Sequence, residues 1–364
     1  MMAFAFGAPG RYLQGAGVID VIGDYVARLG SRVLVAGGKN GLKVTQEGRE
    51  RSFESHGIRQ FENLFGGECC DSEILRLSGI ASENGCDVIL AAGGGKVIDT
   101  VKAASENLRL PAVIVPTIAA SDAPCSALAV IYNEDGTFCR MMPLRNSPAL
   151  VLVDTGIIAR APVRQLVSGM GDALATWYEA EAARKTGTLN LFGGNISSAA
   201  MALSKQCSDT LLEHGREAKL SCQKQQVTPA LESVVEANTL LSGLGFESGG
   251  VAVAHAVSEA FSRIHAMHGM THGEKVAFGL IVHLIMENQP LEVIGEILSF
   301  YTDVGLPRTL VELGYKGDAD ELQMAAFDAA SPERPAQNLR AGITGNEIYD
   351  AIMKADEIGR RNKG

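Results

Sequence analysis

Four short apolar runs dominate the first half of the chain. They are RVLVAGG (32–38), DVILAAGGG (87–95), AVIVPT (112–117) and ALVLVDT (149–155), and each ends in glycine, threonine or aspartate. Strands that are apolar on both faces are typical of parallel sheets covered by helices, with ligands bound beyond the carboxyl ends of the strands. The runs therefore predict an α/β, Rossmann-like parallel-sheet domain. The stretch ALAVIYNEDGTFCRM (127–141) predicts an inserted hairpin that turns at Asp135 and Gly136.

After about residue 162 the strand-like runs nearly vanish. In TPALESVVEANTLLSGLGFE, Thr228 suits a helix cap, Pro229 suits the first turn, and Leu231, Val234, Val235, Leu241 and Leu244 recur on one face. A chain of 364 residues is also long for one hydrophobic core. We therefore predict a dinucleotide-binding α/β domain over 1–161 and an all-α domain, which binds metal and substrate, over 162–364.

Composition limits the classes of partner and the cellular setting that we expect. A formal net charge of −10 argues against a protein that coats nucleic-acid phosphates. The seven cysteines contain no C-x-x-C pair, which favours free thiols in a reducing cytoplasm. No stretch approaches the roughly 20 apolar residues of a membrane span, and the start lacks the features of a signal peptide. We expect a soluble, cytoplasmic protein without nucleic-acid or membrane partners.

Two strand ends carry candidate ligand-binding groups. VILAAGGGKVIDTVKAA runs from a strand through Gly93–Gly95 into a helix near Lys96, and such a turn can hold a pyrophosphate at the helix N-terminus. It is neither G-x-G-x-x-G, since Ile98 replaces the third glycine, nor a P-loop, so a ligand-free turn is the alternative. The segment PTIAASDAPCSA (116–127) gathers hydroxyls and Asp122 at the next strand end; a self-satisfied polar loop is equally compatible.

Four of the seven histidines lie between His255 and His272. A catalytic metal needs about three protein ligands, usually imidazoles with a carboxylate, and Asp172 in SGMGDALATW offers one near the expected start of a helix. An aspartate there is most often a cap, and a single histidine is most often structural. The density of histidines beside a nucleotide-binding half favours a metal site. The H-E-x-x-H pattern is absent, so a zincin protease is excluded.

Taken together, FGGEC (65–69), GGGKVIDT, PTIAASDAPCSALAVIY, GMGDALATW, LSGLGFESGG, AHAV and HGEKVAFG (272–279) resemble the glycerol dehydrogenases of the iron-containing alcohol dehydrogenase superfamily, in its zinc-using branch. The resemblance covers nearly the whole chain. It implies a dehydroquinate synthase-like architecture with the active site in the cleft between a Rossmann-like and a helical domain. It also implies NAD-dependent, zinc-assisted oxidation of glycerol, and of small vicinal diols, to dihydroxyacetone or the corresponding hydroxyketone.

Matched motif by motif, the resemblance also implies site residues. One Zn²⁺ per subunit would be held by Asp172, His255 and His272, and Asp122 would face the polyol. His268 is our candidate for a proton relay through water. The residues expected near NAD are Gly38, Gly94, Gly95, Lys96 and Asp99, with Thr117, Ser126, Leu128 and Tyr132 on the nicotinamide side. A small polyol is the expected partner, and closed homo-oligomers, up to octamers, are expected for the family.

Two positions depart from related sequences. Relatives that use iron often carry a histidine ligand four residues after the metal aspartate, where this chain has Thr176, so three ligands remain. Glycerol dehydrogenases commonly have an aspartate after the first strand that binds the adenosine ribose, whereas here AGGKN places Gly38 at that position. We expect weaker discrimination between NAD and NADP as a result.

Other activities stay open at this point. A relative within the superfamily could act on another diol, a hydroxyketone or a polyol phosphate. A dehydroquinate-synthase-like lyase would share the fold and use nicotinamide only transiently. A metal-dependent binding protein without turnover is disfavoured, because the cofactor and metal motifs are both intact.

Overall fold

The computed structural model describes residues 3–315, 317 and 319–361. The chain folds into two compact units. One contains Gly7–Gln165 together with Leu220–Gly243, and the other contains Leu166–Lys219, the chain from Leu244 onwards and the segment that ends at Phe6. The predicted domains, 1–161 and 162–364, include residues outside those described, and the boundary between them stays a prediction.

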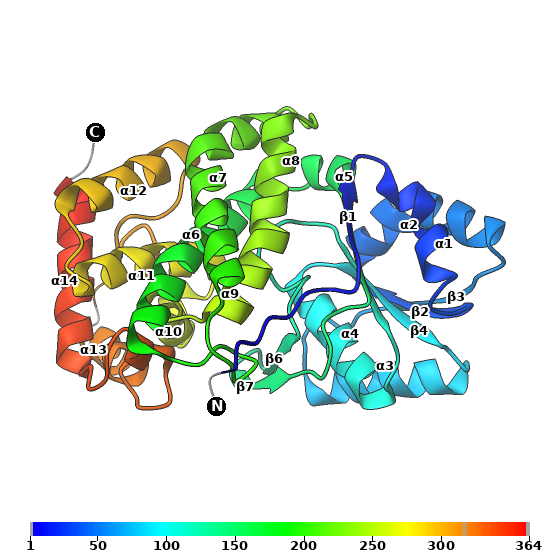
Figure 1. Cartoon of the computed structure of the whole chain (residues 1–364), viewed down its shortest axis with the longest axis horizontal. Helices are drawn as coiled ribbons and strands as arrows, with labels where there is room; N and C mark the ends of the chain where they lie inside the picture. The colour runs from blue at the N-terminus through cyan, green and yellow to red at the C-terminus, as the bar shows by residue number, and fades with distance from the viewer. Residues whose placement is uncertain (1–2, 316, 318, 362–364) are drawn as a thin grey trace. The chain divides into compact units, whose positions relative to one another are not determined.

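The first unit is built on six parallel strands in the order β1-β8-β5-β4-β2-β3. The four predicted apolar runs are all present as parallel strands of this sheet (Figure 1). Their bounds are β2 (Arg32–Gly37), β4 (Val88–Gly93), β5 (Ala112–Pro116) and β8 (Leu150–Asp154). The two edge strands, β1 (Tyr12–Gly15) and β3 (Arg59–Leu64), were not predicted, because they are partly exposed and so carry few consecutive apolar residues.

Helices cover both faces of this sheet. Alternate strand residues such as Val33, Val35, Leu90 and Val113 join one core cluster with the helices that precede and follow β2. Those elements are η1 (Val18–Val21), α1 (Ile22–Val26) and α2 (Lys39–Ser55). The other group, α3 (Asp71–Glu83) and α4 (Gly95–Leu108), packs together and against β2, β4 and β5. The continuous apolar runs follow from this double coverage.

The predicted hairpin is a separate two-stranded antiparallel sheet. Its strands are β6 (Leu128–Tyr132) and β7 (Phe138–Pro143), and β6 packs on α4. Two further short helices complete this unit, α5 (Thr155–Ala159) and α8 (Pro229–Glu236). Thr228 caps α8 as predicted by accepting a hydrogen bond from the backbone N–H of Leu231. A π-helical turn, η2 (Ala237–Leu241), follows α8 within the stretch that was predicted to be helical.

The second unit is helical. Among the described residues after β8 there is no strand, only an isolated bridge between Phe4 and Asn195. Its long helices are most of α6 (Val163–Thr186), most of α7 (Ser198–Gln223), α11 (His272–Met286), α12 (Leu291–Val304) and α14 (Gly345–Arg361). Shorter ones are α9 (Ser242–Gly249), α10 (Val253–Phe261), α13 (Ala319–Ala329), η3 (His265–Met267) and η4 (Pro335–Asn338). Within the described part, no single helix has the length and apolar character needed to cross a membrane.

Gly41 allows α2 to lie directly on β4. A Cβ built at Gly41 would stand 2.2 Å from the carbonyl oxygen of Ala92. We therefore expect Gly41→Ala to lower the free energy of unfolding by about 1–3 kcal/mol, as overpacking does. Gly79 is the control, because it lies on the exposed face of α3 with no atom within 4 Å of a built Cβ. Gly79→Ala should stabilise by about 0.5–1 kcal/mol; urea unfolding of both variants measures the difference.

Candidate metal centre and phosphate-binding turn

Three side chains from three helices of the second unit converge. They are Asp172 of α6, His255 of α10 and His272 of α11, and their potential ligand atoms all lie within 4.8 Å of one another. The Nε2 atoms of His255 and His272 stand 3.4 and 3.2 Å from Oδ1 of Asp172. Two ligand atoms of a tetrahedral zinc site are roughly 3.3 Å apart, given metal–ligand distances of about 2.0–2.1 Å. The separations from Asp172 to each imidazole therefore suit a metal of this kind.

A close approach between α6 and α11 brings Asp172 and His272 together. A Cβ at Gly273 would stand 1.7 Å from the carbonyl oxygen of Ser168, and one at Gly171 would stand 2.5 Å from that of Gly273. Only glycine at these two positions lets the helix backbones touch. Thr271 starts α11 at the required residue through a reciprocal capping box with Glu274. His272 is thus fixed at the first position of its helix.

The position of Asp172 corrects our prediction. It is not near the start of a helix but is the tenth residue of α6, which begins at Val163. Gly169 and Gly171, which suggested a helix start, lie inside the helix. At least one of them serves helix packing instead, since Gly171 is where α11 makes its contact. An N-terminal capping role for Asp172 is therefore excluded.

Asp172 has the electrostatics of a cation ligand. Its side chain is 1% exposed, and neither carboxylate oxygen has a hydrogen-bond partner among the described residues. Burial acts to raise the pKa of Asp172, but the imidazoles of His272 and His255 outweigh it and hold the pKa well below its usual range. A buried carboxylate that is ionised and lacks hydrogen bonds requires a compensating cation. A divalent metal satisfies that requirement, and the donor set suits zinc.

Glu179 is a functional candidate that the sequence did not reveal to us. It lies two turns after Asp172 on the same face of α6 and is fully buried. Its Oε2 is 2.5 Å from Nδ1 of His255, and its Oε1 accepts hydrogen bonds from the backbone N–H groups of Ala252 and His255, at 2.7 and 3.1 Å. A carboxylate on Nδ1 directs Nε2 of the ring towards the metal position. The seven-residue spacing was the available signal.

The remaining residues of the histidine-rich stretch behave differently. His265 and His268 are exposed, and their rings face each other edge-on with centroids 5.1 Å apart. Neither belongs to the three-residue cluster. Ser258 lies 3.4 Å from Nδ1 of His272 through its hydroxyl oxygen and helps to orient that ring. The role of His268 in proton transfer stays a prediction.

In the first unit, the glycine turn leads from β4 into α4. Gly94 is the N-cap of α4 and provides no side-chain cap, so the first N–H groups of the helix are available to an anion. The backbone N–H of Thr117, just beyond β5, donates to the carbonyl of Gly93 at 3.0 Å and joins the two strand ends. Lys96 is in the first turn, with Nζ 2.6 Å from Glu68 and 5.9 Å from the centre of the Tyr132 ring.

A buried ion pair anchors the hairpin to α4. Lys102 Nζ lies 2.8 Å from Asp99 Oδ1, with the two side chains 1% and 10% exposed. Lys102 also donates to the carbonyl oxygens of Ala123 and Leu128, and Asp99 accepts from the N–H of Val130 at 3.1 Å. Asp99, predicted to lie near NAD, is therefore engaged in holding β6. Lys102 was not predicted.

The other predicted residues of this unit lie at the ends of strands. Ser126 is buried with its hydroxyl 3.3 Å from Lys102 Nζ, and Leu128 and Tyr132 begin and end β6. Oδ2 of Asp122 accepts a hydrogen bond of 2.8 Å from Ser242. Gly38 caps α2 in an ordinary extended conformation, and a Cβ there would meet no atom within 4 Å.

This combination defines a class: an α/β unit with a candidate phosphate-binding turn and a helical unit with a candidate metal centre. The model of the iron-containing alcohol dehydrogenase family matches residues 9–155. A glycerol dehydrogenase of Escherichia coli O6:H1 is 46% identical over 97% of both chains. One from Thermotoga maritima is 47% identical over 98% of this chain and 97% of the relative. The solved structure of glycerol dehydrogenase from Schizosaccharomyces pombe superposes with a TM-score of 0.96 at 35% identity, covering 100% of this chain and 93% of that one.

The chain therefore belongs to the glycerol dehydrogenase family of iron-containing alcohol dehydrogenases. The resemblance stated from its motifs is confirmed, and so is the predicted fold class.

Replacing Glu179 tests its support of His255. With zinc added as the test metal, we expect Glu179→Gln to weaken binding at this cluster by about 10–100-fold, because the amide is a poorer acceptor for the imidazole N–H than the carboxylate. Competition with a chromogenic chelator measures the affinity. Glu181→Gln is the matched control, since Glu181 is on the same helix and pairs only weakly with Lys185, at 3.6 Å. Equal zinc affinity in both variants would show that Glu179 does not support the site.

Replacing Lys102 tests the buried ion pair. Lys102→Met leaves Asp99 buried without its counter-charge, so we expect a loss of about 3–5 kcal/mol in the free energy of unfolding. Adding Asp99→Asn should restore most of that loss. Lys43→Met, at an exposed position on α2, should change stability by less than about 0.5 kcal/mol. Urea unfolding compares the four proteins, and a double variant no more stable than Lys102→Met contradicts the pairing.

Proposed function

We propose that this chain oxidises glycerol, and small vicinal diols, to dihydroxyacetone or the corresponding hydroxyketone, with transfer of hydride to NAD. The observation that carries the proposal is the buried cluster of Asp172, His255 and His272 in a chain nearly half identical to glycerol dehydrogenases over its length. A polyol is the substrate class that this family membership supports.

The metal is the first component. Asp172, His255 and His272 hold one Zn²⁺ per subunit, and Thr176 in place of a third histidine leaves three protein ligands. Zinc in such a set supplies Lewis acidity that lowers the pKa of the substrate hydroxyl. Glu179 keeps the His255 ring oriented. Three protein ligands also leave room for the substrate oxygen.

The coenzyme and the polyol are held by residues of the first unit. The N–H groups at Gly94, Gly95 and Lys96 bind the pyrophosphate, and the positive end of α4 favours it electrostatically. Thr117, Ser126, Leu128 and Tyr132 contact the nicotinamide half, which accepts the hydride. Asp99 acts through Lys102 by holding β6 in place.

Asp122 accepts hydrogen bonds from the hydroxyl groups of the polyol. Ser242 donates to Oδ2 of Asp122 and orients its carboxylate. His268 carries the released hydroxyl proton to solvent through water. The exposed position of His268 supports exchange with bulk water.

The state of the cysteines bears on the cellular setting. All seven cysteines are free and six of them are buried, which suits a reducing cytoplasm.

An exposed apolar group lies on the N-terminal segment and the loop before α7, and its members are Phe4, Phe6, Leu189, Leu191 and Phe192. Contiguous exposed apolar side chains favour association. We propose a symmetric homo-oligomer, up to an octamer, which light scattering tests.

Coenzyme reduction tests the activity. NADH formation is followed with glycerol, 1,2-propanediol, 2,3-butanediol and sn-glycerol 1-phosphate, before and after chelation and with zinc restored. We expect zinc-dependent turnover of glycerol or the small diols. Turnover of the phosphate ester alone would overturn the substrate, and hydride transfer with none of them would favour the lyase reaction. His272→Ala should abolish kcat with little change in stability. His214→Ala, on α7, is the control and should leave kcat unchanged.

Coenzyme choice is tested at Gly38. We expect a preference for NAD over NADP, in kcat/KM, well below a thousandfold in the natural chain, because no carboxylate is present there to repel the 2′-phosphate. Gly38→Asp should raise that preference by about tenfold or more, since a carboxylate would accept from the ribose hydroxyls. The position has space for the side chain. Gly38→Asn is the uncharged control, and an equal change in both variants would show that charge is not the cause.

A further inference from the structure

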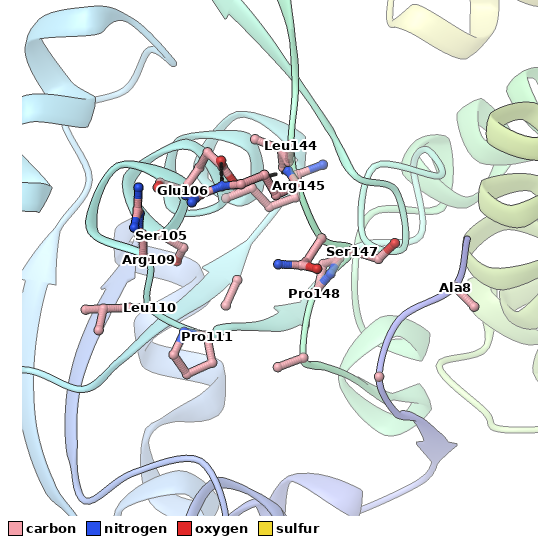
Figure 2. Close-up of a pocket in the computed structure, with 15 residues that line it drawn as sticks. Ala8, Ser105, Glu106, Arg109, Leu110, Pro111, Leu144, Arg145, Ser147 and Pro148 are labelled. Carbon is pink, nitrogen blue, oxygen red and sulfur yellow. Dashed lines mark hydrogen bonds and ion pairs between the residues drawn. The ribbon is translucent and has the colours of Figure 1, made fainter. Parts of the chain in front are cut away.

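A cavity of about 480 Å³ opens at the amino-terminal edge of the parallel sheet (Figure 2). It lies where α4 ends and β5 begins, against the segments that lead into β1 and β8. Its volume is within the range of about 300–1,000 Å³ that small-molecule sites occupy. None of its lining residues has a part in the metal centre or the glycine turn. The polar side chains that line it belong to Lys102, Ser105, Glu106, Arg109, Arg145 and Asn146.

Of the cationic side chains that line the cavity, one has no partner among the described residues and can bind a ligand. Lys102 is paired with Asp99. Arg145 is held by Glu106, to which it donates from its backbone N–H at 3.1 Å and from its guanidinium. The side chain of Arg109 makes no hydrogen bond or ion pair with any residue that the structure describes, and it is exposed. The cavity thus carries a net positive charge that is concentrated on Arg109.

Arg109 also has an unusual backbone. It ends α4 with φ 58° and ψ 36°, in the left-handed region. Glycine occupies this position at the ends of helices most easily, and a residue with a Cβ is strained there. The chain nevertheless places a long cationic side chain at this point on the rim of the cavity.

Ser105 supplies a second, independent observation. It lines the cavity and is 4% exposed, yet its hydroxyl oxygen is buried without a hydrogen-bond partner among the described residues. A serine inside a helix commonly satisfies its hydroxyl on the carbonyl four residues earlier, as Ser78 does on α3. Figure 2 shows Ser105, Arg109 and Arg145 around the same hollow. A buried hydroxyl beside an unpaired guanidinium indicates a polar, anionic ligand.

We propose that this cavity binds a small hydroxylated metabolite that carries one oxyanion group, either a carboxylate or a phosphate. The Arg109 guanidinium pairs with the oxyanion, for which its planar donors are suited. Ser105 and Asn146 form hydrogen bonds with the hydroxyl groups of the ligand. The ion pair of Arg145 with Glu106 forms the opposite wall and stays intact.

The site is separate from the coenzyme turn. The cavity includes the first residue of β5, whereas the glycine turn lies beyond the carboxyl ends of β4 and β5. Five strand residues span roughly 16 Å. The ligand therefore does not compete with NAD for the turn, and the proposal does not depend on the proposed function.

Calorimetric titration of the whole chain tests the site. The probes are inorganic phosphate, sn-glycerol 3-phosphate and glycerate, at constant ionic strength. We expect one probe class to bind once per chain and Arg109→Gln to weaken that binding by about tenfold or more. Arg160→Gln is the matched control, because Arg160 is another exposed arginine that caps a helix, α5, in the same unit. It should leave the affinity unchanged, and binding at the glycine turn would be insensitive to Arg109.

A second variant protects the test against misfolding. Ser105→Ala removes the buried hydroxyl without adding volume, and we expect it to weaken binding several-fold at unchanged thermal stability. Binding of the phosphates but not glycerate identifies a phosphorylated ligand, and the reverse identifies a carboxylate. Equal affinity in the natural chain and Arg109→Gln, or no heat of binding with any of the three probes, would overturn the proposal.

Discussion

The helical unit holds the buried carboxylate of Asp172 against two imidazoles, and the candidate metal centre depends on this arrangement. An ionised carboxylate without hydrogen bonds is costly inside a protein unless positive charge lies next to it. A divalent metal bound by Asp172, His255 and His272 would meet that need, and the place of His272 beside Asp172 depends on backbone contact at Gly171 and Gly273. A side chain at either glycine would push α6 and α11 apart and move His272 away from Asp172.

The sheet unit depends on a second buried charge. Lys102 is neutralised by Asp99, and its ammonium group also binds carbonyl oxygens of the loop and strand that follow β5. One cation thereby ties two segments to α4. In both units the chain uses a charge that cannot be left unpaired to position the residues that face a ligand.

Much of the fold followed from hydrophobic patterns. The four central strands are apolar on both faces because helices cover both faces of the sheet. Their continuous apolar runs therefore predicted them. The edge strands β1 and β3 are partly exposed, and the same rule overlooked them. The hairpin was accessible through its turn residues Asp135 and Gly136. Local sequence therefore predicted the elements whose burial is complete or whose turn chemistry is specific.

The site was predictable only in part. The ligand types and the family were evident from motifs around Asp172, His255 and His272. The carboxylate of Glu179, the Lys102 ion pair and the cavity at Arg109 were not, because each depends on which helix faces meet. Asp172 was misplaced because its two flanking glycines suggest a helix start, whereas the structure uses Gly171 for helix contact. The α/β and helical halves could be predicted from the sequence, as could a candidate phosphate-binding turn and a candidate set of metal ligands, since they depend on local periodicity, turn chemistry and motif spacing. Which charges are paired and which are left available emerged with folding, because pairing is a matter of distance and burial between segments far apart in the chain. Asp172 and His272 are 100 residues apart in sequence and 3.2 Å apart in space. Two glycines with no charge of their own allow that contact.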